Sequence, residues 1–133
     1  MFEIGRIYNR QKELHDIYGG NRQSGISSCS NHPIIFIFSS PIGSQHGYLD
    51  RWESDQIYVY TGEGQIGDME LVRGNKAIKN HLKNGKQLHL FKKVGRTDYI
   101  YEGEFEYKNH EVVIGSDSDK RIRKRIDFFL NRL

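Results

Sequence analysis

Residues 47–81 read GYLDRWESDQIYVYTGEGQIGDMELVRGNKAIKNH, the stretch with the most unusual residue choices in the chain. Aromatic side chains surround a carboxylate at its start, where Tyr48, Asp50 and Trp52 follow one another at alternate positions. The run 56–61 then alternates between residues that favour β-structure, which predicts a strand. Aromatic rings beside a hydrogen-bond acceptor suit a pocket for a flat ring that carries amino groups.

Glycines punctuate the segment that follows this strand, and they allow a loop whose backbone approaches a ligand closely. A short helix is expected at 75–82, with Asn75 as its N-cap. Polar and cationic side chains at the start of this segment suit a phosphate, and we expect Arg73, Asn75, Lys76 and Lys79 to contact nucleic acid. The whole stretch therefore predicts a nucleic-acid-binding module that inspects a single base.

The totals bound the architecture to one domain, 1–133, because a chain of 133 residues has room for one hydrophobic core. No run approaches the roughly 18 apolar residues of a membrane span. The N-terminal residues lack the apolar stretch of a signal peptide, so we expect a cytoplasmic protein without a membrane partner. The lone Cys29 excludes an internal disulfide framework and a multi-thiolate zinc site.

Alternating and apolar runs predict six or seven strands and two short helices. The wholly apolar run IIFIF indicates a strand that is buried on both faces. We expect an α+β domain whose curved antiparallel sheet or small β-barrel is flanked by the helices. The remaining expected elements are a helix at 9–18, a hairpin of 86–94 with 99–107, and strands at 111–114 and 122–130.

Signatures of catalysis are absent from the sequence. It contains no G-x-S-x-G, no H-E-x-x-H and no P-loop, and its six histidines are dispersed. Gly62-x-Gly64-x-x-Gly67 matches the dinucleotide-binding pattern, but no βαβ unit surrounds it. We therefore predict no catalytic residue, no metal and no cofactor.

The pocket residues suggest how a base would be read. Tyr48 and Tyr60 lie twelve positions apart, where two rings are able to sandwich a flipped base. Flipping costs a few kcal/mol and stacking returns roughly 1–3 kcal/mol. Asp50 would accept from the amino group of cytosine, and backbone groups of Thr61 and Gly62 would read the rest of the base edge. The same residues also fit ordinary sheet aromatics and a turn carboxylate, so the pattern alone leaves both interpretations open.

The block YTGEGQ, GD and RGNKAI (60–65, 67–68 and 73–78) resembles the SRA domain, the SET- and RING-associated module that binds modified cytosine. GYLD at 47–50 and YEGEF at 101–105 are similar to further motifs of that family. YGGNRQSGIS at 18–27 resembles a segment of the SRA-like domains of McrA-type, modification-dependent HNH restriction endonucleases.

This resemblance implies a PUA-like barrel and a base-flipping pocket for 5-methylcytosine or 5-hydroxymethylcytosine in double-stranded DNA. It implies that Tyr48 and Tyr60 stack on the base, that Asp50 accepts from its amino group, and that Thr61 helps to close the pocket. Arg22 and Gln23 would fill the gap that the base leaves. Where some relatives have a second acid this chain has Arg51, so Asp55 is the reserve candidate for the carboxylate. The nuclease would belong to a separate HNH domain or partner.

Three other interpretations remain open. An RNA-binding PUA-like module would stack a single-stranded base on the same tyrosines. A small enzyme acting on a modified nucleotide would use Asp50 or Asp68 as its acid–base group. Recognition of a phosphorothioate backbone would make Tyr48 and Tyr60 dispensable. The basic run 120–125 fits either a phosphate contact or the solvated face of a strand.

Overall fold

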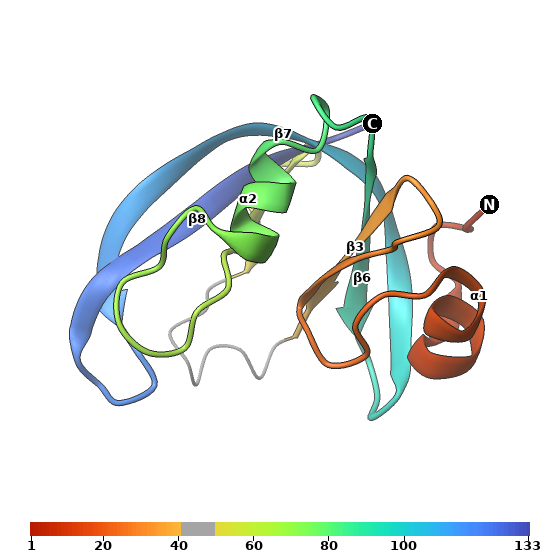
Figure 1. Ribbon diagram of the computed structural model, residues 1–133, viewed down its shortest axis with the longest axis horizontal. Helices are drawn as coiled ribbons and strands as arrows, with labels where there is room; N and C mark the ends of the chain where they lie inside the picture. Colours follow the sequence, from red (N-terminus) through yellow and green to blue (C-terminus); the bar gives the residue numbers. More distant parts are fainter. Residues whose placement is uncertain (41–49) are drawn as a thin grey trace.

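An eight-stranded sheet organises the chain in a computed structural model, which describes residues 1–40 and 50–133. Its strands follow the order β2-β3-β6-β7-β8-β5-β4, and β1 pairs with β7 outside this path (Figure 1). The strand bounds are β1 Ile7–Asn9, β2 Ile26–Ser28, β3 Ile34–Ser39, β4 Arg51–Trp52, β5 Ile57–Thr61, β6 Gln87–Lys93, β7 Asp98–Ser116 and β8 Ile122–Arg132.

The sheet is mixed rather than purely antiparallel. β3 and β6 are parallel and all other pairs are antiparallel, because the chain crosses over through β4, β5 and a helix before it returns beside β3. The end strands β2 and β4 do not pair with each other within the described residues, so the sheet is curved but not closed there. The predicted α+β domain with a curved, mainly antiparallel sheet is confirmed, whereas the expectation of a closed barrel is corrected for the described residues.

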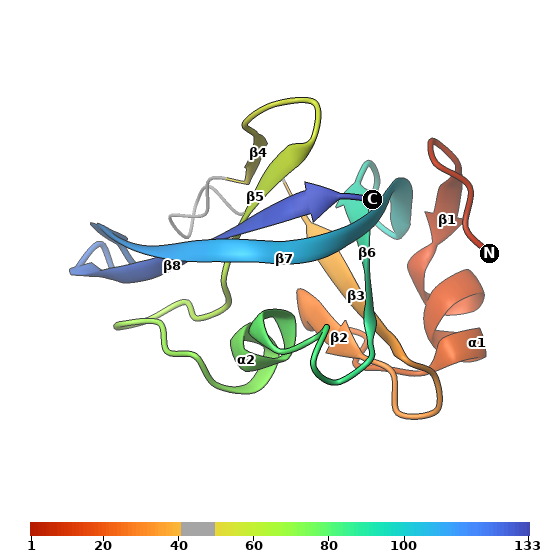
Figure 2. The same cartoon turned by 90° about the horizontal axis from the view of Figure 1, so that it is seen from above.

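Two short helical segments flank the sheet. The π-helix η1 (Arg10–His15) runs into α1 (Asp16–Tyr18), and the Asn9 side chain caps it by accepting from the amide of Lys12 at 2.8 Å. The second helix, α2 (Arg73–Lys79), begins two residues before the predicted start. Figure 2 shows α2 beneath β7 and β8, with α1 at the other end of the molecule beside β1.

The strand β3 separates two hydrophobic clusters. Ile35 and Ile37 contribute to the cluster that also includes β5, β8 and α2, whereas Phe36 and Phe38 contribute to the cluster beside η1. Each such fully buried side chain contributes about 1.5–3 kcal/mol to folding. The prediction that this apolar run is buried on both faces is therefore confirmed.

Two successive hairpins, β6–β7 and β7–β8, form the other half of the sheet. The first is the predicted hairpin of 86–94 with 99–107, which is confirmed; its register shifts at Leu90/Phe91 opposite Gly103. The second, of β7 with β8, is long. β7 continues through the predicted strand 111–114 without a break. The hairpin brings the basic run 120–125 back toward the glycine loop, a position that bears on the site.

Candidate nucleic-acid-binding site

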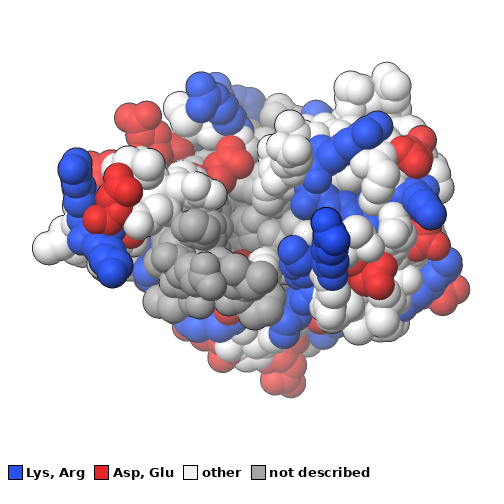
Figure 3. Space-filling model, turned by 90° about the horizontal axis from the view of Figure 1, so that it is seen from below, with Lys and Arg blue, Asp and Glu red and all other residues white. Residues whose placement is uncertain are grey.

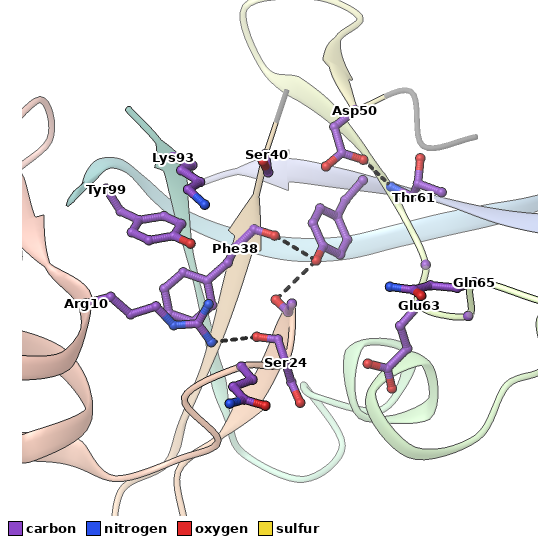
Figure 4. A pocket seen from close by; sticks show the side chains of 15 residues that line it. Arg10, Ser24, Phe38, Ser40, Asp50, Thr61, Glu63, Gln65, Lys93 and Tyr99 are labelled. Carbon is purple, nitrogen blue, oxygen red and sulfur yellow. Dashed lines mark hydrogen bonds between the residues drawn. The ribbon is translucent and has the colours of Figure 1, made fainter. Parts of the chain in front are cut away.

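A pocket of about 440 Å³ opens where the C-terminal ends of β3 and β5 meet the glycine loop (Figure 4). Segments far apart in the sequence supply its walls. On one side lie Asp50 and the end of β5, and on the other lie the start of η1 and the ends of the β6–β7 hairpin. Its lining residues include Arg10, Gln23, Ser24, Gly25, Phe38, Asp50, Tyr60, Thr61, Gly62, Glu63, Gly64, Lys93 and Tyr99.

The carboxylate of Asp50 is held by hydrogen bonds from Thr61 and Ser39. Its Oδ1 accepts from the backbone amide of Thr61 at 2.7 Å, and its Oδ2 accepts from the hydroxyl of Ser39, also at 2.7 Å. Burial raises the pKa of Asp50, and the hydrogen bonds from Thr61 and Ser39 oppose that shift. An ionised carboxylate has about four lone-pair sites, so Asp50 retains the capacity to accept a further bond.

Tyr60 forms the wall beside this carboxylate. Its side chain is only 5% exposed, and its hydroxyl donates to the carbonyls of Phe38 at 3.0 Å and Gly25 at 3.1 Å. These bonds join β5 to the end of β3 and to the loop before β2, and they fix the ring at the pocket.

Thr61 and Gly62 line the pocket, but their backbone N–H groups are already used. The amide of Thr61 donates to Asp50, and the amide of Gly62 donates to the carbonyl of Ile126 at 2.8 Å. Of the backbone groups expected to read a base edge, these two amides are therefore not available to do so. Their function in the pocket is to hold Asp50 and to continue the pairing of β5 with β8.

The glycine loop is fastened from inside the protein by Asn75. This side chain is 1% exposed; its Oδ1 accepts from the amide of Glu63, and its Nδ2 donates to the carbonyls of Glu63 and Glu70. Asn75 lies within α2, and Val72 occupies the N-cap position. The predictions that Asn75 caps the helix and contacts DNA are both wrong, since its polar atoms bind the loop.

Arg123 fastens the same loop from β8. Its Nη1 donates to the carbonyls of Gly64 at 3.0 Å and Gly67 at 2.9 Å, and the side chain is buried. One residue of the basic run 120–125 thus serves neither a phosphate nor a solvated face. It stabilises the loop that borders the pocket.

A cationic and aromatic wall faces Asp50 across the pocket. The guanidinium of Arg10 lies 3.6 Å from the ring centre of Phe38 and donates to the carbonyls of Ser24 and Asn21 (Figure 4). Burial lowers the pKa of Arg10, which remains a cation. No local sequence pattern predicts this wall, because its members lie on η1, β3 and β7.

The sequence model of the family described as "ScoMcrA-like, SRA domain" matches residues 4–133. The chain belongs to this family. The histone-lysine N-methyltransferase, H3 lysine-9 specific SUVH5 of Arabidopsis thaliana, is 26% identical over 135 residues, which cover 86% of this chain and 17% of that protein.

Solved structures share the fold of this SRA domain. The sulfur binding domain and SRA domain of ScoMcrA complexed with phosphorothioated DNA align with a TM-score of 0.78 and 22% identity, over 100% of this chain and 40% of that chain. The SUVH5 SRA complex with fully methylated CG DNA aligns with a TM-score of 0.72 and 24% identity, over 98% of this chain and 88% of that chain. The chain therefore spans less than half of the ScoMcrA structure and about a sixth of the SUVH5 protein.

The structure brings together only part of the predicted site of this SRA domain. Asp50, Tyr60, Thr61, Gly62 and Gln23 line one pocket. Tyr48 lies outside the described residues. Trp52 does not line the pocket; its ring packs on Tyr58 and Phe105, and Arg132 lies over it, so its predicted place in the pocket is corrected.

The predicted phosphate contacts lie around the pocket rather than in it. Arg73, Lys76 and Lys79 are exposed on α2, and Arg73 borders a second hollow beside the glycine loop. Arg22 is exposed next to Gln23 and faces a different hollow from the base pocket.

Within residues 1–40 and 50–133, no three His, Cys, Asp or Glu side chains are grouped to hold a metal, and no helix is long and apolar enough to cross a membrane.

Proposed function

We propose that this SRA domain binds double-stranded DNA containing 5-methylcytosine or 5-hydroxymethylcytosine and takes the flipped base into the pocket of Asp50 and Tyr60. The observation that carries this proposal is the fixed carboxylate of Asp50 at the wall of a 440 Å³ pocket, next to a fixed tyrosine ring. That volume is within the range of sites that bind small molecules, about 300–1,000 Å³.

The chemistry of the pocket favours a base with an exocyclic amino group. Ionised Asp50 accepts hydrogen bonds and donates none, so it pairs with the N4 amino group of cytosine and opposes the O4 carbonyl of thymine. Tyr60 supplies one stacking surface. We assign the opposite surface to Tyr48, in the segment 41–49. Stacking of roughly 1–3 kcal/mol offsets the few kcal/mol that flipping costs.

Contacts outside the pocket would hold the duplex. Gln23, at the rim of the pocket, is positioned on the loop that we assign to the gap left by the base. Arg73, Lys76 and Lys79 are exposed cations and retain their assignment as phosphate contacts, whereas Asn75 is withdrawn from it.

We further propose that the domain is the specificity module of a modification-dependent restriction system. The relative in this class is the Type IV phosphorothioation-dependent restriction endonuclease ScoMcrA, of whose structure this chain covers 28%. In this proposal cleavage belongs to an HNH domain or partner, and the SRA domain alone binds without cutting.

A titration with four short duplexes tests the proposal at fixed salt concentration. The duplexes differ only at one site, which holds cytosine, 5-methylcytosine, 5-hydroxymethylcytosine or a glucosylated cytosine. We expect at least one modified duplex to bind ten or more times more tightly than the unmodified duplex, a difference of about 1.4 kcal/mol. Equal dissociation constants for all four would contradict the proposal, and single-stranded RNA would then be the next ligand to test.

A further inference from the structure

A smaller hollow of about 180 Å³ lies beside the base pocket and is lined by three arginines. Arg10 comes from η1, Arg22 from the loop after α1, and Arg96 from the turn between β6 and β7. No carboxylate is among the residues that line this hollow. On the face seen in Figure 3, the densest group of Lys and Arg side chains lies to the right of the hollowed centre, and others lie at the left and the top of the view.

Two of the three charges are uncompensated in the part of the chain that the structure describes. Arg22 and Arg96 are exposed, and their side chains form no hydrogen bond or ion pair with another described residue. Acidic side chains on the nearby helical segment are already engaged: Glu13 accepts from the amide of Asn9, and Asp16 accepts from Gln11. The hollow therefore gathers positive charge, and no carboxylate lines it.

Arg10 differs from the other two because the protein holds it in place. Its Nε donates to Nε2 of His15 at 2.9 Å, and its Nη2 donates to the carbonyls of Asn21 and Ser24. His15 is neutral in this arrangement, since its Nδ1 lies 2.8 Å from the carbonyl of Gly19 and must donate to it. A fixed guanidinium at the wall between two hollows provides an anchor with little entropy left to lose on binding.

The lining and position of the hollow indicate the kind of ligand. Three arginines and no carboxylate line it, which suits one anionic group such as a phosphate. The hollow shares Arg10 and Tyr99 with the base pocket, so a phosphate bound in it lies next to a base bound there. The guanidinium groups of Arg22 and Arg96 are able to bind phosphate oxygens through paired hydrogen bonds, whereas Arg10 has only its Nη1 left to donate, because its Nε and Nη2 are engaged.

We infer that Arg10, Arg22 and Arg96 form the binding site for a backbone phosphodiester of the strand whose base enters the pocket. This inference rests on the proposed function, and it assigns Arg22 to the backbone rather than to the gap in the duplex. A phosphate contact fixes the register of the DNA and carries no information about the base.

Salt-dependent binding of the double variant Arg22→Ala/Arg96→Ala tests this assignment on duplexes with 5-methylcytosine and with cytosine. The slope of log K against log salt concentration is negative, and each lost phosphate contact reduces its magnitude by about 0.9, so two lost contacts reduce it by about 1.8. We expect the affinity for both duplexes to fall by the same factor, about tenfold or more, with unchanged selectivity. The matched control is Lys83→Ala/Lys108→Ala, which removes the same charge at exposed positions near the other end of β6, where His81 accepts from the amide of Tyr107.

The outcomes separate this site from the proposed function. The site is supported if the double arginine variant reduces the magnitude of the slope by about 1.8 and the double lysine variant leaves it unchanged. An equal loss of slope in both pairs would show a general charge effect, and no loss in the arginine pair would show that no phosphate binds there; either result overturns the site. A loss of selectivity for 5-methylcytosine in the arginine pair would return Arg22 to the gap and also overturn it. The wild-type protein, by contrast, tests the proposed function alone, through its preference for the modified duplex.

Discussion

Replacing Asp50 by Asn tests how the pocket distinguishes cytosine from thymine. In the wild-type chain one oxygen of Asp50 accepts from the amide of Thr61 and the other from the hydroxyl of Ser39. In Asp50→Asn the side-chain oxygen would still accept from the amide of Thr61, and Nδ2 would donate to the hydroxyl oxygen of Ser39. The hydroxyl hydrogen of Ser39 would then turn to the hydroxyl of Tyr58, which lies 2.7 Å away. The substitution thus preserves these two hydrogen bonds and removes the charge.

The loss of charge determines the size of the effect. Whichever oxygen of Asp50 meets the base, the variant offers either a neutral acceptor or a donor in its place. A hydrogen bond to a charged group contributes about 1.5–3 kcal/mol. We therefore expect the preference for 5-methylcytosine over thymine at the same site to fall by between about 10-fold and 100-fold.

Competition between duplexes that carry 5-methylcytosine or thymine, each in its normal base pair, measures this preference. The control is Asp55→Asn, the same chemical change at an exposed position five residues away, and we expect it to leave the preference unchanged. A preference that survives in Asp50→Asn and falls in Asp55→Asn would show that Asp55 reads the base. Survival in both would refute the assignment of a carboxylate to the amino group.

Three further results follow from the same contacts. Asn75→Ala should lower the free energy of unfolding, measured in urea, by about 3 kcal/mol, because three hydrogen bonds to the loop are lost. The control Asn84→Ala, at an exposed position, should change it by under about 0.5 kcal/mol, and equal effects of the two substitutions would contradict the function of Asn75 in holding the loop. Tyr60→Phe should lower this free energy by about 1–2 kcal/mol and keep the selectivity for modified cytosine. Tyr60→Ala should abolish the selectivity, and selective binding by this variant would show that the ring does not stack on the base. Burial raises the pKa of Asp50, so its carboxylate becomes protonated, and the selectivity for modified cytosine should fall, at a pH that is still above the ordinary pKa of Asp. The contribution of Asp50 to the free energy of unfolding has the opposite pH dependence: it is complete below that ordinary pKa and is lost as the pH rises through the raised value. A pH profile of unfolding that Asp50→Asn leaves unchanged would contradict the shift.

The parts of the fold with strong local signals could be predicted from the sequence. The apolar run of β3, the alternating run of β5 and the turn between β6 and β7 each specify their structure through neighbouring residues. The parallel pairing of β3 with β6 could not be predicted, because it depends on a crossover of more than forty residues, 40–86.

The candidate site shows the same division. Asp50 and Tyr60 lie close together in the sequence, and the residue pattern indicated both. Arg10 enters the site only because the fold places η1 beside the end of β3. Polar residues are usually exposed, so the sequence predicts surface positions for Asn75 and Arg123, yet both are buried where they satisfy the backbone of the glycine loop.

Base flipping is the central claim, and the fluorescence of 2-aminopurine placed beside the target cytosine tests it most directly. This base is quenched by stacking in a duplex and brightens when its neighbour leaves the stack. We predict that saturating SRA domain raises the fluorescence of the 5-methylcytosine duplex, and that Tyr60→Ala at equal occupancy does not. Saturated, selective binding without any rise in fluorescence would show that the modified base is read inside the duplex, and would contradict the account of the pocket.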